Sequence, residues 1–147
     1  GLGVITSSSE LIQFLQEKGI RKGNKVKHQV GVPKWIRENP QFSISCLRGL
    51  FDTDGGIYHH RHRSGGHTYL NMGLTFSNRS LPLLRFVQYT LRDLGFTPKI
   101  SFKGFDIVLY RETEILDYTR KVGFHNPYHL ARIEKFQEIK RRGARAV

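Results

Sequence analysis

The stretch of sequence that decides the fold is Leu47-Arg48-Gly49-Leu50-Phe51-Asp52-Thr53-Asp54-Gly55, preceded by Ser43-Ile44-Ser45-Cys46. Its apolar side chains recur at steps of three and four residues, which predicts a short helix with one buried side. Gly49 has no side chain, so a second backbone could approach there, and a similar helix is the expected partner. Asp52 and Asp54 would lie at the helix C-terminus, where the helix dipole disfavours negative charge. The stretch therefore predicts a helix that ends beside a divalent cation.

This nonamer resembles the signature motif of the LAGLIDADG homing endonucleases. Six of its positions match that signature identically: Leu47, Gly49, Leu50, Asp52, Asp54 and Gly55. Phe51 and Thr53 are tolerated replacements, whereas Arg48 stands where the family usually has a small alanine. An aspartate pair before a glycine is also common in turns. The apolar helix before the pair and the paired strands expected after it favour the family resemblance.

The composition points to a nucleic-acid partner. The chain has 147 residues, enough for one domain with a real core, and 24 Lys and Arg against 12 Asp and Glu give a formal charge of +12. The excess of Lys and Arg is spread over the whole chain, so the domain itself is basic and not only one terminal segment. No membrane partner is expected, because no helix is basic on one side and bulky-apolar on the other. The single cysteine, Cys46, rules out an internal disulfide and favours an intracellular location.

Patterns downstream of the motif predict two hairpins separated by a helix. Residues 57–63 and 67–77 form the first hairpin, and the strict alternation in 67–77 gives it one buried and one wet face. Residues 80–94 form an amphipathic helix, 98–102 and 105–110 a second hairpin, and 112–122 and 128–142 two further helices. The expected fold class is α+β, with the order αββαββα and helices packed on one face of a curved, four-stranded antiparallel sheet.

A similarity between two segments of the sequence, which we call the internal echo, predicts the domain organisation. Residues 9–20 resemble residues 80–96, and Gly19 and Gly95 follow the two expected helices at a spacing of 76. Residues 1–42, which include a basic turn at 21–25 and a short proline-started helix at 32–36, thus resemble the end of a preceding repeat. Residues 43–147 form the complete LAGLIDADG domain. The alternative is a protein with one motif and an N-terminal extension, which would have to form a dimer.

The resemblance implies a metal site at the end of the motif helix. Asp54 and the main-chain carbonyl of Gly55 would bind Mg²⁺ or another hard divalent cation, and the acid of a second LAGLIDADG half would complete the site. Asp52 is more consistent with a structural role near the helix end. Family members usually carry a basic residue in the turn before the last helix. Here Tyr128 replaces it, so His125 and His129 are the tentative catalytic substitutes.

The wet face of the sheet is the expected surface for double-stranded DNA, because a curved antiparallel sheet can lie in the major groove. The candidate contacts are His60, Arg61, His62, Arg63, Tyr69, Asn71, Thr75, Lys99, Ser101 and Lys103. We count no acidic residue on this face. The phase of the first strand is ambiguous, since Ile57 and Arg61 would share a side. Leu47, Gly49 and Leu50 are the expected contacts of the helix pair.

Taken together, these features predict a site-specific DNA endonuclease that makes a Mg²⁺-dependent double-strand break, as a dimer or as part of a two-repeat protein from an intron or intein. The alternative is a nucleic-acid-binding module or RNA-splicing maturase of the same fold that has lost cleavage. A third possibility is a structural domain of an intein-like protein, which predicts no salt-dependent affinity for DNA.

Overall fold

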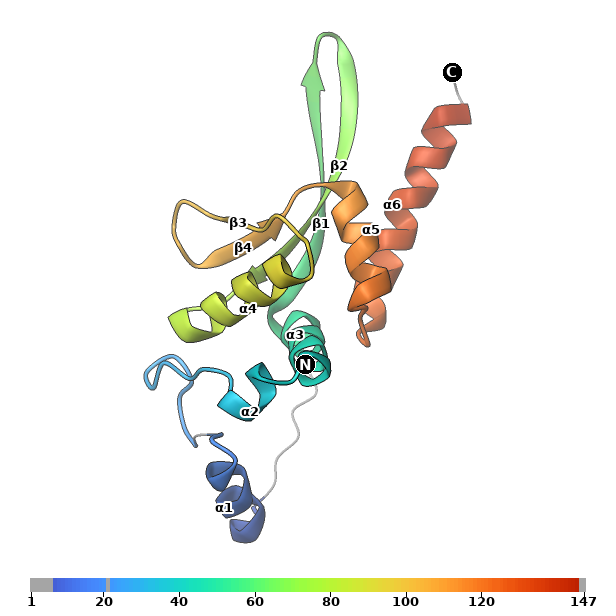
Figure 1. Ribbon diagram of the computed structural model, residues 1–147. Helices are drawn as coiled ribbons and strands as arrows, with labels where there is room; N and C mark the ends of the chain where they lie inside the picture. Colours follow the sequence, from blue (N-terminus) through green and yellow to red (C-terminus); the bar gives the residue numbers. More distant parts are fainter. Residues whose placement is uncertain (1–6, 21, 146–147) are drawn as a thin grey trace.

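The computed structural model describes residues 7–20 and 22–145, which form helices over a four-stranded antiparallel sheet (Figure 1). Arg21, part of the predicted basic turn, lies outside the described residues. The elements follow in the order α1 (Ser9–Glu17), α2 (Lys34–Arg37), α3 (Pro40–Asp54), β1 (Gly55–Ser64), β2 (His67–Ser77), α4 (Leu81–Asp93), β3 (Lys99–Ile100), β4 (Asp106–Leu109), α5 (Glu112–Lys121) and α6 (Pro127–Arg145). From α3 onward this is the predicted αββαββα order with one further helix.

The strands lie in the order β1-β2-β4-β3, and one face of the sheet is covered by helices. Met72, Leu74 and Phe76 of β2 and Ile107 and Leu109 of β4 point to this covered face and are at most 2% exposed. They pack with buried side chains of the helices, including Leu47, Phe51, Val87, Leu91, Ile115, Tyr118 and Phe136. The alternation in residues 67–77 therefore predicted the buried face of β2 correctly.

The register of the first hairpin resolves the phase of β1. Ile57 pairs with Leu74 and Arg61 with Leu70, so both lie on the covered face, together with Arg63. His60 pairs with Asn71 and His62 with Tyr69, on the open face. Arg61 and Arg63 therefore lie on the other face from the two histidines, because side chains on a strand alternate strictly between its two faces, and their predicted contact with DNA stays a prediction. The hairpin projects beyond β4 and β3 (Figure 1).

The motif helix begins three residues earlier than its apolar pattern predicts. Asn39 caps α3, accepting hydrogen bonds from the N–H groups of Gln41 and Phe42, and Pro40 occupies the first helical position. Proline fits this position because its missing N–H would have no partner inside the helix. Asn39 and Pro40 therefore begin the motif helix.

The two helices of the internal echo end in the same way. Gly19 and Gly95 have φ of +83° and +88°, and each donates its N–H to the carbonyl three residues earlier, at 2.9 Å. The next residue in each case donates to the carbonyl five residues earlier. Such left-handed caps favour glycine, because a side chain there is strained. The surroundings differ, however, since α1 has no buried residue whereas Leu91 of α4 is fully buried.

Gly55, where α3 passes directly into β1, has no room for a side chain. A Cβ at Gly55 would lie 2.4 Å from the carbonyl oxygen of Phe51 and 2.9 Å from its Cα, and these backbone atoms cannot move away independently. We expect Gly55→Ala to lower the free energy of unfolding by about 1–3 kcal/mol, the usual cost of an overpacked site. Urea unfolding followed by circular dichroism measures the change.

The matched control for this prediction is Gly49→Ala in the same helix. No atom lies within 4 Å of a Cβ built at Gly49. Alanine is the better helix former by about 1 kcal/mol, so this variant is expected to be at least as stable as the wild type. Equal stability of the Gly55 and Gly49 variants would contradict the tight passage from α3 to β1.

The buried phenol of Tyr118 is a second feature of the core that can be tested. Its ring is fully buried and its hydroxyl has no hydrogen-bond partner among the described residues. Burial raises the pKa of the Tyr118 phenol, the charge of Asp52 raises it further, and Arg48 opposes both. An unpaired buried hydroxyl costs stability, so Tyr118→Phe should raise the free energy of unfolding at pH 7.5 by about 1 kcal/mol.

The effect of Tyr118→Phe on the free energy of unfolding should also depend on pH. Above about pH 10 a tyrosine ionises in the unfolded chain, whereas the folded protein still holds its proton on Tyr118. The wild type thus loses stability there, and Tyr118→Phe should lose less between pH 7.5 and 10.5. Tyr89→Phe, at a tyrosine that is 59% exposed, is the control. Destabilisation by Tyr118→Phe at pH 7.5 would show that the hydroxyl has a partner.

Candidate nucleic-acid interface and active site

Asp54, the last acid of the motif, lies at the end of α3 and is held by one basic and one amide side chain. Its Oδ2 accepts a hydrogen bond from Nζ of Lys25 at 2.7 Å and another from Nδ2 of Asn78 at 2.8 Å. The side chain of Asp54 remains 26% exposed. The carboxylate is therefore fixed through one oxygen and still open to solvent.

Lys25 reaches Asp54 from the N-terminal segment, 29 residues upstream. The turn that carries it is organised by Asn24, whose side chain accepts hydrogen bonds from the N–H groups of Val26 and Lys27 at 3.0 and 2.9 Å. This is the usual way in which asparagine builds a turn. The basic segment at 21–25 was predicted as a turn, but no sequence signal assigned Lys25 to the site.

Gln29 and Ser80 attach this segment to the start of α4. Gln29 has φ of +47°, uncommon for a residue with a side chain, and is held in it by its own contacts. Its amide donates to the carbonyls of Val26 and Arg79 and its Oε1 accepts from the N–H of Leu81. The Ser80 hydroxyl donates to the Val30 carbonyl at 2.7 Å. These long-range bonds specify where Lys25 lies.

Asn78 is the second site residue that the sequence reasoning missed. It is 8% exposed, its N–H donates to the Phe105 carbonyl, and its Oδ1 accepts from the N–H of Ser80. With Nδ2 on Asp54, each end of the amide is used, which is how buried polar groups are normally satisfied. Asn78 thus orients the carboxylate from the sheet side. It follows β2 directly, but nothing in its local pattern marks that role.

Asp52 has the predicted structural role. Its carboxylate accepts hydrogen bonds from the N–H groups of His125 and Asn126 at 3.1 Å, and its own carbonyl accepts from Nδ2 of Asn126. Three donors thus join the end of α3 to the turn before α6. Arg48 supports the same turn, donating to the Val122 carbonyl at 2.6 Å. This contact explains why a long basic side chain replaces the small alanine of the family motif.

The two tentative catalytic histidines lie beside Asp52, not beside Asp54. The ring of His125 contacts Nη1 of Arg48 at 3.1 Å through Nε2, which must accept because arginine only donates. His129 is 3% exposed, and its Nε2 donates to the Phe51 carbonyl at 3.1 Å. The structure thus gives His129 a structural role at the helix end in place of the predicted catalytic one. A catalytic role for His125 stays a prediction without a contact to Asp54.

The oxygen donors at Asp54 suit a hard cation only as part of a shared site. Among residues 7–20 and 22–145, no group of three or more His, Cys, Asp or Glu side chains could hold a metal ion. Mg²⁺ keeps several waters and needs only one or two protein carboxylates together with substrate phosphate. Asp54 and the Gly55 carbonyl fit that requirement if a second acid and the DNA supply the rest.

The open face of the sheet carries a continuous row of rings, Tyr58, His60, His62 and Tyr69, which we call the ring row. Neighbouring ring centroids are 6.0, 6.1 and 5.2 Å apart. Tyr58 covers the backbone of Gly73, and its burial, followed by the nearby Tyr110, raises the pKa of its phenol. His60, His62 and Tyr69 are exposed. The predicted contacts His60, His62, Tyr69 and Asn71 therefore lie together on this face.

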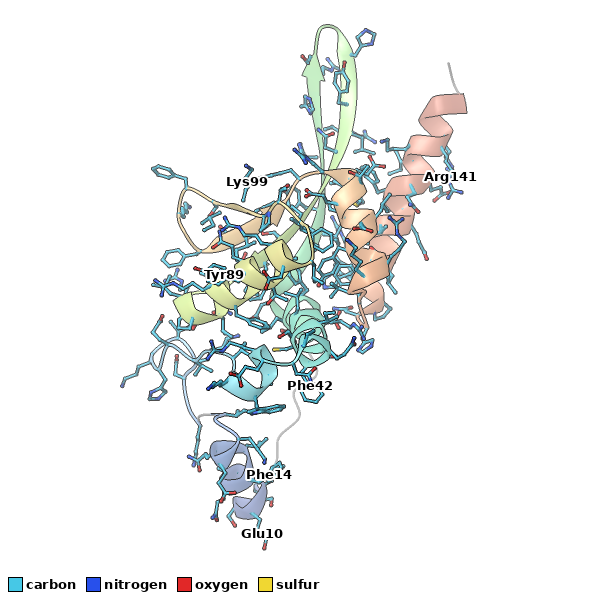
Figure 2. All side chains as sticks on the ribbon, in the orientation of Figure 1. Glu10, Phe14, Phe42, Tyr89, Lys99 and Arg141 are labelled. Carbon is cyan, nitrogen blue, oxygen red and sulfur yellow. The ribbon has the colours of Figure 1, made fainter. Side chains whose placement is uncertain are left out.

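The remaining predicted DNA contacts lie toward the other end of the sheet. Thr75 pairs with Val108, which pairs with Lys99, so all three share the open face, and Figure 2 shows Lys99 beside the sheet. Lys103 is exposed in the β3–β4 turn. The hydroxyl of Ser101, however, donates to Asp106 at 3.0 Å, and Ser77 donates to the same carboxylate at 2.6 Å. The open face does contain one acid, contrary to our expectation, because Asp106 is opposite Ser77 in the register.

The three residues expected at the contact between two motif helices differ in their exposure. Leu47 is 0% exposed inside the core of this chain, so its predicted place in the helix pair is wrong. Gly49 is exposed with open space at its Cα, and Leu50 is half-buried at the edge of the core. Phe42, at the start of the same helix, is 49% exposed (Figure 2). The predicted contact with a second motif helix stays a prediction for Gly49 and Leu50.

The fold and this site define a mixed sheet-and-helix domain with a carboxylate-bearing helix end and an open sheet face of aromatic and polar side chains. A family model described as LAGLIDADG-like domain matches residues 41–135, about two thirds of the chain. The chain therefore belongs to the LAGLIDADG family of homing endonucleases and related maturases. None of the curated proteins matches it. Over the described part of the chain, no helix is long and apolar enough to cross a membrane.

The contacts of Asp52 predict a large effect on stability. Asp52→Ala would leave the N–H groups of His125 and Asn126 without their carboxylate acceptor, and hydrogen bonds to charged groups are worth about 1.5–3 kcal/mol each. We expect the free energy of unfolding to fall by about 2–4 kcal/mol in urea titrations. The control, Asp93→Ala, removes an exposed acid at the end of α4 and should change it by less than about 0.5 kcal/mol. Similar losses in both variants would contradict the structural role of Asp52.

Proposed function

We propose that this chain is one half of a site-specific DNA endonuclease that hydrolyses phosphodiesters with Mg²⁺ and makes a double-strand break together with a second LAGLIDADG half. The observation that carries the proposal is the arrangement at Asp54. Lys25 and Asn78 hold Oδ2 of this carboxylate, whereas no described residue donates a hydrogen bond to Oδ1. The carboxylate thus has one fixed and one available oxygen.

Each residue of the arrangement has a role in the proposed reaction. Asp54 and the Gly55 carbonyl would hold the cation, which when bound activates water and stabilises the leaving oxygen. Asn78 keeps the carboxylate in one orientation. Lys25 is 52% exposed, so its ammonium can neutralise a phosphate beside Asp54 as well as the acid itself. In this proposal Lys25 has the role of the basic residue that we expected in the turn before the last helix.

The charge of the chain supports DNA as the substrate. The formal charge is +12, and Lys99 on the open face and Lys103 in the β3–β4 turn add positive charge toward the end of the sheet away from the ring row. The hydroxyls of Ser77 and Ser101 hold Asp106, the acid that we find there. A surface that neutralises several phosphates binds DNA with a steep dependence on salt. The second motif helix would pack beside the open backbone at Gly49.

A nucleic-acid-binding module without cleavage is the second candidate. The observation that favours it is that no group of three or more His, Cys, Asp or Glu side chains among the described residues could hold a metal ion, so a cation at Asp54 would depend on a second half. This candidate predicts the same salt-dependent binding but no strand breakage by the chain with Mg²⁺.

Cleavage of selected duplexes separates the two candidates. Duplexes enriched by binding from a random pool are incubated with the chain and Mg²⁺, and nicks and double-strand breaks are measured on gels. Asp54→Asn should slow cleavage by about a hundredfold or more, since metal-bound groups supply several kcal/mol in the transition state. Lys25→Met should slow it as well, and both variants should still bind DNA.

Asp93→Asn, which changes an exposed acid outside the site, is the matched control and should cleave normally. Binding without cleavage by the wild type would favour the binding module. Absence of salt-dependent DNA binding would overturn both candidates.

A further inference from the structure

A hydrogen bond between side chains joins Asn71 to the ring row. Nδ2 of Asn71 lies 3.0 Å from Nδ1 of His62 on the open face. The ring of His62 is stacked between its neighbours, 5.2 Å and 18° from Tyr69 and 6.1 Å and 25° from His60. Two stacking partners and one hydrogen bond therefore fix the orientation of an exposed imidazole.

The chemistry of the pair defines which group donates. An amide NH₂ only donates, so Nδ1 of His62 must accept and carries no proton. The second N–H and the Oδ1 of Asn71 have no hydrogen-bond partner in the described part of the chain, and both belong to a side chain on the open face. A donor and an acceptor side by side are what adenine requires, with N7 accepting and N6 donating in the major groove.

We propose that His62 is a positioning residue for base readout, which holds the Asn71 amide in the orientation that recognises an adenine. The proposal rests on the DNA-binding function proposed above and adds a base preference and the residue that sets it. Asn71 makes the base contact, and His62 acts only through Asn71. Stacking on Tyr69 and His60 keeps the imidazole in place when the duplex is absent.

Binding selection from a randomised duplex pool at pH 8.0 and constant ionic strength tests the proposal. The wild type should prefer adenine at one position by about tenfold, the usual size of such a contact. Asn71→Ala should lose this preference.

Two variants of His62 separate positioning from packing. His62→Phe keeps a stacked ring but removes the acceptor, so it should lose the preference. His62→Gln offers Oε1 as an acceptor for the Asn71 amide, so it should keep the preference. His67→Phe, at an exposed histidine of the same hairpin outside the ring row, is the matched control and should behave like the wild type.

A preference for adenine that survives in His62→Phe, or one that Asn71→Ala leaves unchanged, would overturn the proposal. If the wild type enriches no sequence but binds DNA, base readout by this pair is wrong while DNA binding stands. If it binds no DNA, the proposed function itself fails. Nitrogen NMR of the free protein at pH 8.0 gives an independent check that does not rely on variants, since a proton on Nδ1 of His62 would also overturn the proposal.

Discussion

The carbonyl and carboxylate oxygens at the C-terminus of α3 need hydrogen-bond donors. Several of the long-range contacts of the chain supply them. The last carbonyls of a helix have no partner inside it, and two aspartates add negative charge where the dipole is already unfavourable. The Phe51 carbonyl accepts from Gly55 and His129, the Asp52 carbonyl from Asn126, and the Asp54 carboxylate from Lys25 and Asn78. Four separate segments thus meet at one helix end, and a site is built there because the donors converge.

Much of the fold follows from patterns within single elements. The alternation of residues 67–77 predicts the buried side of β2, and the glycines at 19, 95 and 123 mark helix ends because all three have positive φ. The phase of β1 needed its partner strand, since HHRHR contains no apolar residue to mark a buried side. Asn39 and Pro40 were not predicted as the start of α3, because a proline stops a preceding helix and starts a following one equally well.

The site was predicted only in part, for a related reason. Asp54 and Asp52 stand in a recognisable motif, and the structural role of Asp52 was predicted correctly. Lys25, Gln29 and Asn78 reach the site across 24 to 50 residues through side-chain contacts, and no local periodicity reports such contacts. His129 was misjudged because a histidine in a turn before a helix gives no sign of whether its ring points to solvent or to a carbonyl.

The N-terminal segment is attached to the domain at the site but not through a core of its own. Lys25, Gln29 and Ser80 join residues 25–30 to Asp54 and to the start of α4, whereas α1 lies apart from the sheet (Figure 1) and leaves Phe14 52% exposed. An amphipathic helix gains its stability mainly by burying its apolar face. The segment therefore has specific polar contacts with this domain and an apolar surface still without a partner. The assignment of residues 1–42 to the end of a preceding repeat stays a prediction, and under it Lys25 of one repeat would hold Asp54 of the next.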